Sequence, residues 1–529
     1  MSILPRGRRA VTRAESLVIG AVCLVVIGLA ATAPGDVGTL LAGAAVGAVV
    51  AYVVLSDPLL ALLLVLAASF FRLAQREIVS TEALTPAVIL LLVSLTLAIA
   101  RHAKMPPKLG AVEWLMAVYL AWNILSWLLP HPVEAIEPVT GAPILVYRWI
   151  YTGVLLPFLV YVIAKSVIDD ERGARWLLWT TVAMAAYSSW VSILQFHGPK
   201  SLVWPRYIVD APNWEGRANG IFNQPVVNGV ILVIGFVVCL FLASRPGVKR
   251  SVQVVLYGLA AANAYSVYLT HTRAALLALI VVLGMGILLA PGWRRGFVAF
   301  TVLGMIGVAA NASSIFSSDR SDGGVGSSTE VYDRLNLMAT AMRAMGEHPF
   351  VGIGLARFQF YNTDHHVAWS QDVPWDAGYA IISHENEFGI GAELGIPGVL
   401  MWLAVIVAVV WMLWRAMREL PRDTYLGSAF AFVGASAMVT MIVNGLTVDL
   451  RILDFAMILP FMFAGMVAGA LERHRDDQAT RRPRPGVVGG GLPTGMSLDD
   501  QQRWLDDHPA GEPARAAARP VAASPHPVR

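Results

Sequence analysis

Long apolar runs, separated by short polar segments, recur along the chain from about residue 15 to residue 470. A helix of about 20 apolar residues is long enough to cross the hydrocarbon core of a membrane. Runs of roughly that length occupy the stretches 15–33, 37–55, 58–71, 84–100, 110–129, 144–164, 175–196, 225–244, 251–270, 274–290, 296–312, 396–414, 427–446 and 452–470. The run at 58–71 is short, so the region 37–71 also fits a bent pair or a re-entrant segment. The pattern predicts an all-α integral membrane protein with about 12–14 transmembrane helices.

Composition agrees with this prediction and removes other classes of protein. Of the 529 residues, 56% are hydrophobic and only 14% are charged, whereas soluble domains carry about 25% charged residues. A formal net charge of +3 gives no electrostatic support to a nucleic-acid partner. The two cysteines, Cys23 and Cys239, lie inside apolar runs, so we expect neither a disulfide framework nor a cysteine metal site.

Loops rich in lysine and arginine alternate along the chain with loops that hold few of these residues. Cytoplasmic loops carry an excess of both residues. With the N-terminus inside, the inner loops hold Arg101, Lys104, Lys108, Lys165, Arg172, Arg175, Arg245, Lys249, Arg250, Arg294, Arg295, Arg415, Arg418 and Arg422. The basic N-terminus precedes a run without a convincing cleavage site, which we interpret as an uncleaved first helix. Both termini are therefore predicted to be cytoplasmic.

Composition changes near Asp476, where proline, arginine, alanine and glycine become frequent. Such a segment buries too little apolar surface to offset the entropy of ordering it. We therefore predict a polytopic membrane domain at 1–475, with a large outer loop at about 313–395, and a disordered cytoplasmic tail at 476–529. Within the tail, the segment 497–505 has the capping pattern of one short helix.

Polar residues gather on the predicted outer face, away from nucleotides. The loop 197–224, the turn 271–273 and the loop 313–395 carry four arginines of interest, Arg217, Arg273, Arg334 and Arg357. Arginine grips a diphosphate through bidentate hydrogen bonds and stays charged near lipid. An arginine at a helix end also often only extends to the lipid headgroups. An enzyme on this face must draw its energy from a pre-activated substrate carried by the membrane.

The same face carries histidines and one further pair of charges. Asp449 and Arg451 sit between the last two spans, where they fit an ion pair at the outer edge or the lining of a cavity. The stretch 363–366 contains three residue types that bind zinc, but adjacent ligands close on one ion only in a distorted loop. We therefore expect no metal site.

Two loop segments carry a more specific pattern. HPFVGIGLARF (348–358) followed by SHENEFGIGAELGIPGV (383–399) resembles the signature of the O-antigen ligase and polymerase superfamily. In that family an outer-face histidine precedes a Glu-Leu-Gly segment by nine residues, and His384 and Glu393 keep this spacing. Three more segments resemble family elements in the family's order: EGRANGIFNQP (215–225), THTRAALLAL (270–279) and YDRLNLMATAMRAMGEHP (332–349). Family members usually have Asn directly after the histidine, whereas here Glu385 intervenes.

The resemblance implies a glycosyltransferase of the bacterial cytoplasmic membrane, working in cell-envelope polysaccharide biosynthesis. Such enzymes move a glycan from a polyprenyl diphosphate carrier, such as undecaprenyl diphosphate, to a glycan or glycolipid acceptor at the outer leaflet. Some relatives transfer to protein instead. The resemblance also implies an inverting reaction without metal or other cofactor, on a fold similar to the C-type integral-membrane glycosyltransferases.

Residue chemistry suggests roles within such a site. A neutral imidazole is well matched to deprotonating an acceptor hydroxyl near neutral pH, which makes His384 the candidate base. Glu385 or Glu387 is placed to orient it, and we include Glu387 and Glu393 among the candidate catalytic residues. Glu393 also fits a capping or positioning role. For the diphosphate we nominate Arg217 and Arg273 first, then Arg334 and Arg357, because preorganised cations stabilise the charge of a departing diphosphate.

Two other functions remain open at this stage. A transporter or flippase of lipid-linked glycans shares the fold class, but we expect charged or helix-breaking residues near mid-membrane in such a protein. A non-catalytic envelope scaffold has no reason to gather arginine and histidine at helix mouths. Replacing His384 separates these functions, since only the enzyme depends on it.

Overall fold

The apolar runs form helices close to the predicted positions in the computed structural model, which describes residues 47–48, 50–78, 82–290, 292–315, 317, 328–375 and 379–481. The longer helices are α3 (Pro58–Phe70), α4 (Leu84–Ala100), α5 (Ala111–Leu128), α7 (Leu156–Val167), α8 (Glu171–His197), α10 (Pro225–Ala243), α11 (Arg250–Leu269), α12 (Arg273–Leu289), α13 (Arg294–Ala310), α15 (Thr329–Glu347), α17 (Asn386–Glu419), α18 (Ser428–Gly445) and α19 (Asp454–Arg481). Shorter helical segments are η1 (Ala74–Glu77), α6 (Val146–Ile150), the π-helical turn η2 (Tyr151–Leu155), η3 (Lys200–Leu202), α9 (Tyr207–Asp210), η4 (Gly220–Phe222), α14 (Ala312–Ile315), α16 (Phe358–His365) and η5 (Leu450–Ile452).

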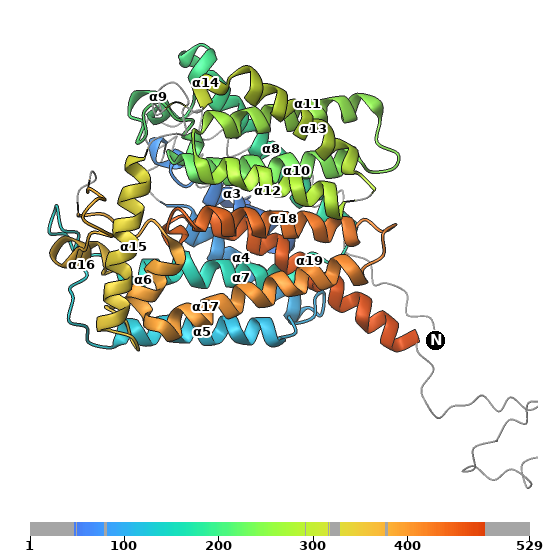
Figure 1. The fold of residues 1–529 in the computed structure, drawn as a ribbon. Helices are drawn as coiled ribbons and strands as arrows, with labels where there is room; N and C mark the ends of the chain where they lie inside the picture. Colours follow the sequence, from blue (N-terminus) through green and yellow to red (C-terminus); the bar gives the residue numbers. More distant parts are fainter. Residues whose placement is uncertain are drawn as a thin grey trace, which may run out of the picture. The chain divides into compact units, whose positions relative to one another are not determined.

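The predicted fold class is confirmed for the described part of the chain, which is helical and contains no β-strand (Figure 1). Among the described residues, eight helical stretches are long and apolar enough to cross a membrane: α5, the continuous α6–η2–α7, α8, α10, α11, α17, α18 and α19. Helices α3, α4 and α12 are apolar but shorter. The predicted span 15–33 lies outside the described residues and 37–55 lies mostly outside, so the total of 12–14 stays a prediction.

The chain divides into a unit ending at His474 and a second unit from Arg475 to Arg529. The features described below belong to the first unit. The predicted helix at 497–505 and nearly all of the predicted tail lie outside the described residues.

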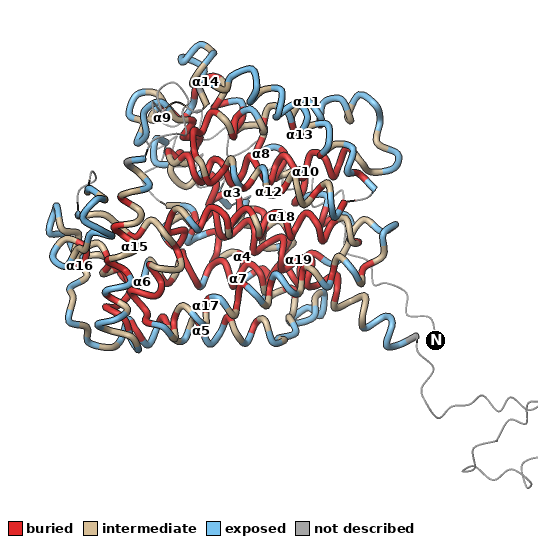
Figure 2. Tube along the Cα trace, viewed as in Figure 1, coloured by how far each residue is buried: buried red, intermediate tan, exposed pale blue. Residues whose placement is uncertain are grey.

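Helix α10 forms the centre of the packing. Every residue of α10 is buried, and the helix contacts α8, α11, α12 and α18. Figure 2 shows this buried band continuing through α18 and α19, whereas α11 and α13 expose much of their length. A helix that is apolar all round is stable in such a central position, because each of its faces meets another helix.

Small residues bring these helices close together. A Cβ atom added at Gly465 or Gly469 of α19 would lie 2.1 Å from a backbone carbonyl oxygen of α7. A Cβ added at Gly235 of α10 would lie 2.1 Å from the Ala185 side chain on α8. Close backbone approach through glycine and alanine is typical of membrane helix packing, where water supplies no force between helices.

Loops assigned to the inner side meet at one end of the helices. Lys165 Nζ lies 2.6 Å from Glu113 at the start of α5 and 2.8 Å from Glu472 near the end of α19. Lys104, after α4, lies 2.5 Å from Asp169, before α8.

Loops assigned to the outer side meet at the opposite end of the same helices. Arg357 donates a 2.7 Å hydrogen bond to the carbonyl of Val133, in the loop after α5. The predicted large loop contains α15, α16 and the first residues of α17, and α15 lies across the ends of the long helices beside α17 (Figure 1). The grouping of loops thus follows the predicted topology, while the compartment that each end faces stays a prediction.

Candidate functional site

The segments 348–358 and 383–399 bind each other through their backbones. The amides of Ile353 and Gly354 donate 2.9 Å hydrogen bonds to the carbonyls of Ala392 and Glu393, and the amide of Ile396 donates to Pro349 at 2.8 Å. Gly352 (φ +69°) leaves no room for a side chain, since an added Cβ would lie 2.3 Å from the carbonyl carbon of Glu393. The glycines of this pattern are therefore needed for the contact itself.

Gly395 divides α17 into two arms, because its backbone (φ 72°, ψ −179°) is not helical. In a straight helix, residues 15 positions apart lie about 22 Å apart. Here Trp402 Nε1 lies 3.5 Å from Glu387 Oε1, so the arm 386–394 folds back toward the long arm 396–419. The predicted span at 396–414 falls within the long arm.

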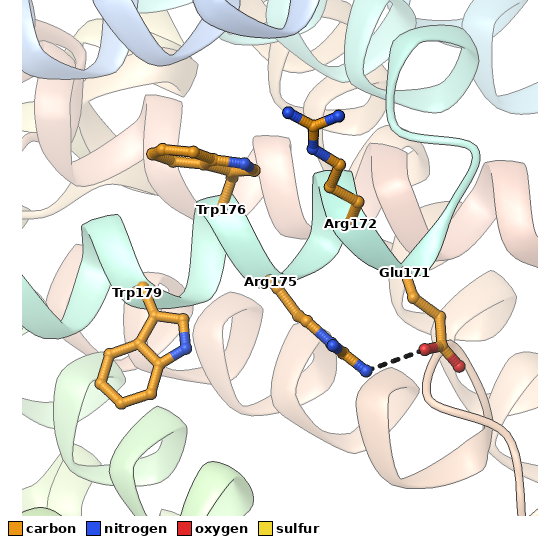
Figure 3. Close-up of a pocket in the computed structure, with 5 residues that line it drawn as sticks. All are labelled: Glu171, Arg172, Arg175, Trp176 and Trp179. Atoms are coloured by element: carbon orange, nitrogen blue, oxygen red, sulfur yellow. Dashed lines mark hydrogen bonds and ion pairs between the residues drawn. The ribbon is translucent and has the colours of Figure 1, made fainter. Parts of the chain in front are cut away.

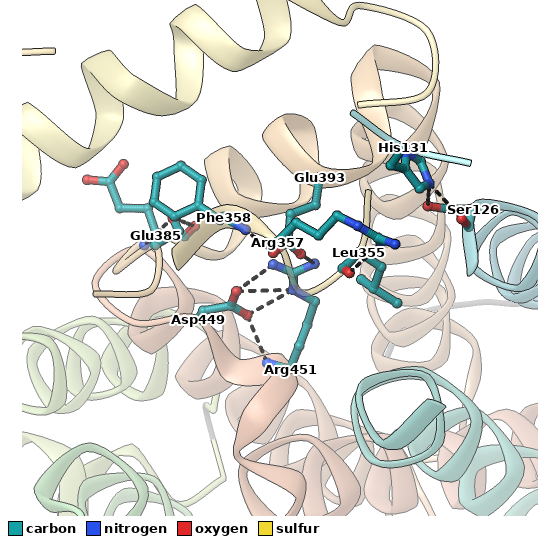
Figure 4. A network of polar contacts seen from close by, with 10 residues as sticks. Ser126, His131, Leu355, Arg357, Phe358, Glu385, Glu393, Asp449 and Arg451 are labelled. Atoms are coloured by element: carbon teal, nitrogen blue, oxygen red, sulfur yellow. Dashed lines mark hydrogen bonds and ion pairs between the residues drawn. The ribbon is translucent and has the colours of Figure 1, made fainter. Parts of the chain in front are cut away.

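Glu393, Asp449 and Arg451 form a buried ionic network (Figure 4). Arg451 Nη1 lies 2.7 Å from Glu393 Oε2, and Arg451 Nη2 lies 2.5 Å from Asp449 Oδ2. All three side chains are 1–2% exposed. The second oxygen of Glu393 accepts a 3.1 Å hydrogen bond from the amide of Phe358. The network therefore ties the loop 348–358 and α17 to the turn between α18 and α19.

Glu330 joins two of the predicted arginines. Its Oε1 lies 2.6 Å from Nη2 of Arg217, and its Oε2 lies 3.6 Å from Nη2 of Arg334, one turn further along α15. The Arg217 guanidinium also lies over the Trp214 ring, 5.0 Å from the centroid. We call Arg217, Glu330 and Arg334 the arginine cluster.

Arg273 lies beside the same loop through its backbone neighbours. It is the first residue of α12, and two residues earlier the imidazole Nδ1 of His271 lies 2.7 Å from the carbonyl of Gly216. The amide of Ala218 donates to the carbonyl of Leu269 at 2.8 Å. These contacts hold the segment around Arg217 against the turn that presents Arg273.

His384 is largely shielded from water and lies within the field of the arginine cluster. Burial lowers the pKa of the His384 imidazole, and the charge of Arg334 lowers it further, while Glu330, Asp333 and Asp449 raise it in part. The imidazole is therefore neutral at neutral pH. The carboxylates that raise the pKa of His384 come from α15 and the α18–α19 turn, and the orientation of His384 by Glu385 or Glu387 stays a prediction.

The pKa of the Glu385 carboxyl is also shifted by its surroundings. Burial raises the pKa of its carboxyl to about 7, with Arg334 lowering it and Glu387 raising it. Within the described part of the chain, Glu385 Oε2 is buried without a hydrogen bond.

The remaining predicted residues lie apart from the arginine cluster. The Arg357 guanidinium donates to the backbone carbonyl of Val133 at 2.7 Å and to that of Leu355 at 3.1 Å (Figure 4). Glu387 contacts Asn386 and Trp402, each at 3.5 Å. Glu330 thus links Arg217 with Arg334, and the charge of Arg334 acts on His384, while Arg357, Glu387 and Glu393 contact other partners.

An apolar cavity of about 170 Å³ opens at the same end of the helices, between α3, the start of α10 and the start of α19. Arg72 pairs with Asp454 at 3.3 Å and with Glu82. The cavity is lined by Ser69, Arg72, Leu73, Arg76, Phe222, Gln224, Val227, Ile452, Leu453, Asp454 and Phe455. Phe222 and Gln224 belong to the segment 215–225 that also carries Arg217.

The histidines of the stretch 363–366 stack on aromatic rings instead of converging. The His365 ring lies 4.7 Å from Tyr361 and the His366 ring 3.7 Å from Tyr379, measured between centroids. Among the described residues, no group of three or more His, Cys, Asp or Glu side chains is arranged to hold a metal ion.

Sequence reasoning did not select Glu330 or Asp333, and it left Arg451 outside the site. A signal for Glu330 exists, because it precedes Arg334 by four residues and so faces it on one side of a helix. No local signal pairs Arg451 with Glu393, because the two are brought together only by the folding of α17 against the α18–α19 turn.

Comparison with protein families finds a match in the second half of the chain. Residues 258–403 match the family described as O-antigen ligase. The matched range contains the segments 270–279, 332–349, 348–358 and 383–399. The resemblance to the O-antigen ligase and polymerase superfamily is thereby confirmed, and it supports a glycan-transfer role in polysaccharide biosynthesis. Among curated proteins, no match is found.

Proposed function

We propose that this protein transfers a glycan from a polyprenyl diphosphate carrier to an acceptor hydroxyl at the outer face of the bacterial cytoplasmic membrane. The observation that carries the proposal is the position of His384, a neutral imidazole, beside the arginine cluster. A base and a diphosphate-binding group are the two parts that such a transfer needs. Both termini lie in the cytoplasm in this proposal.

The arginine cluster stabilises the leaving group. As the bond between the anomeric carbon and the diphosphate oxygen breaks, negative charge grows on the carrier diphosphate. Arg217, Arg334 and Arg273 supply cations at that point, in a poorly hydrated site where such stabilisation is strong. Glu330 already pairs with Arg217. The bound diphosphate therefore displaces this carboxylate from the Arg217 guanidinium or shares the guanidinium with it.

His384 removes the proton of the acceptor. The acceptor oxygen attacks the anomeric carbon from the face opposite the diphosphate, its O–H proton passes to the imidazole, and the carrier diphosphate departs. One displacement inverts the anomeric configuration. The lowered pKa keeps the imidazole unprotonated and ready to accept this proton.

Glu393 and Arg357 position the segments that form the site in this proposal. Both oxygens of Glu393 are occupied by Arg451 and the Phe358 amide, so it is a positioning residue and not a second base. The guanidinium of Arg357 is committed to backbone carbonyls. Glu387 stays a candidate for orienting the acceptor. The cavity beside Phe222 is apolar enough to receive the first isoprene units of the carrier.

The test uses full-length protein in lipid vesicles with a radiolabelled polyprenyl-diphosphate glycan and an envelope extract as the acceptor source. Release of carrier diphosphate is compared among the wild type, His384→Ala, Arg273→Ala and the control His365→Ala. Losing a general base lowers a rate by about 10²–10⁴-fold, so His384→Ala is expected to lose release while His365→Ala keeps it. The same assay repeated with a chelator tests whether the reaction needs a metal.

Two results contradict the proposal. If folded His384→Ala protein releases carrier diphosphate as fast as the wild type does, His384 is not the base. Movement of the labelled lipid between leaflets by the wild type, without release of carrier diphosphate, favours a transporter or flippase of lipid-linked glycans instead.

A further inference from the structure

A basic cavity lies at the end of the helices opposite the candidate site. It has a volume of about 380 Å³ and is bounded by the first turns of α8, the end of α10, the start of α11 and the loop before α18. Its polar and aromatic walls are Glu171, Arg175, Trp179, Arg245, Asp423 and Tyr425. None of these residues takes part in the proposed transfer.

Arg245 is the clearest cation in this cavity. Its guanidinium lies over the Phe241 ring, 4.3 Å from the centroid. Within the described ranges its Nε is buried without a hydrogen bond, and its Nη2 makes a long contact of 3.5 Å with Ser244 Oγ. A guanidinium whose donors are so little used is suited to an anionic oxygen ligand.

Arg175 supplies a second cation on the facing wall. It lies 5.0 Å from the centroid of the Tyr425 ring and pairs with Glu171 at 3.0 Å (Figure 3). Glu171 offsets this charge, and Asp423 adds another carboxylate to the wall. Neighbouring positions in the sequence add four basic residues, Arg172, Lys249, Arg250 and Arg422, against two acidic ones, Asp169 and Asp170, which leaves an excess of positive charge in these segments.

Two tryptophans extend the cavity along α8. A wider hollow of about 590 Å³ continues over Arg172, Trp176 and Trp179. Trp176 and Trp179 are 48% and 45% exposed. Exposed tryptophan near a helix end is typical of the level where lipid headgroups meet the hydrocarbon core. The cations therefore lie at headgroup depth, with aromatic surface directed along the helix.

We propose that this cavity binds the phosphate of an anionic phospholipid headgroup. Arg245 and Arg175 hold the phosphate oxygens, and Trp176 and Trp179 contact the glycerol and the upper acyl chain. Basic pockets between membrane helices on the cytoplasmic side are a recognised form of lipid binding. The site is separate from the proposed transfer and stands without it.

Native mass spectrometry of the full-length protein tests this assignment. The protein is titrated with phosphatidylglycerol, with phosphatidylcholine of the same acyl chains, and with glycerol 3-phosphate. The wild type is expected to retain phosphatidylglycerol in preference to phosphatidylcholine, and glycerol 3-phosphate is expected to compete poorly. Arg245→Gln and Arg175→Gln should each weaken retention about tenfold, the effect of one charge-assisted hydrogen bond. Arg101→Gln, an exposed arginine outside the cavity, should leave retention unchanged.

Three outcomes overturn the assignment: equal retention of both lipids, unchanged retention in both cavity variants, or full competition by glycerol 3-phosphate, which indicates a soluble anion. A second measurement does not depend on the folding of the arginine variants. Phosphatidylglycerol with brominated acyl chains should quench tryptophan fluorescence of the wild type more than brominated phosphatidylcholine does, and Trp179→Phe should reduce this difference. Equal quenching by the two lipids contradicts the proposal.

Discussion

The guanidinium of Arg451 and the carboxylate of Glu393, 58 positions apart in the sequence, meet at 2.7 Å in the interior. Asp449 pairs with the same guanidinium, so one cation serves two carboxylates. Removing one partner of the Arg451–Glu393 pair therefore has a different effect on stability from removing the other. Removing the cation leaves two buried carboxylates without a cationic partner, whereas neutralising Glu393 leaves a balanced pair between Arg451 and Asp449.

We therefore expect Arg451→Gln to destabilise the protein far more than Glu393→Gln. Leaving a buried charge unpaired costs about 3–5 kcal/mol, whereas the glutamine that replaces Glu393 can still accept a hydrogen bond, for a loss of about 1 kcal/mol. Thermal unfolding in detergent measures both changes. Arg415→Gln, which breaks the exposed pair with Glu419, is the control and should have little effect. Equal unfolding temperatures for Arg451→Gln and the wild type would show that the network does not stabilise the fold.

The glycines that join the two motif segments give a second prediction. Gly352→Ala places a Cβ 2.3 Å from the Glu393 carbonyl carbon and forces a left-handed backbone (φ +69°) on alanine. The backbone strain alone costs about 1–2 kcal/mol, and the contact with backbone atoms adds to it. Gly346→Ala, in α15 with nothing within 4 Å of the added Cβ, should be neutral or slightly stabilising, because alanine favours helix. Similar unfolding temperatures for the two variants would contradict the docking of 348–358 on α17.

Most of the described helices could be predicted from the sequence, because a membrane span is a long apolar run and this signal is local. Predicted starts such as 84, 225 and 274 lie within one residue of the observed helix starts. Among the candidate residues, Arg217 and Arg334 share Glu330, and Arg334 acts on His384, because the loops that carry them meet at one end of the helices, which the alternation of basic loops indicates. The partners Glu330 and Arg451 depend on contacts between distant segments, and no local pattern specifies these.

The pH dependence of transfer should shift in opposite directions when the charge of Arg334 or that of Glu330 is removed. The base acts when neutral, so activity is present above the pKa of His384, which lies below its ordinary value, and is lost as the pH falls through it. Arg334 lowers this pKa and Glu330 raises it. Arg334→Gln should therefore move the acidic limb to higher pH and Glu330→Gln to lower pH.

The initial rate of carrier-diphosphate release, followed from pH 4 to 9, measures these shifts. Glu385, whose pKa is about 7, titrates in a neighbouring range, so Glu385→Gln serves as the control. An acidic limb that persists in Glu385→Gln belongs to His384. An acidic limb that disappears in Glu385→Gln, or that moves in the same direction in both cluster variants, contradicts the assignment of His384 as the base.

Conservative replacements should separate two arginines that sequence reasoning placed in the same role. Arg217 lies in the arginine cluster, within reach of a bound diphosphate in our proposal, whereas the donors of Arg357 are occupied by the carbonyls of Val133 and Leu355. Lysine keeps the charge but loses the planar fork. Arg217→Lys should therefore raise the KM for the donor about tenfold, the effect of one charge-assisted hydrogen bond, with little change in the unfolding temperature. Arg357→Lys should lower the unfolding temperature and leave the donor KM of the folded fraction near that of the wild type. If Arg357→Lys instead raises the donor KM as much as Arg217→Lys does, the diphosphate contacts both arginines, and the loop 348–358 belongs to the binding surface as well as to its frame.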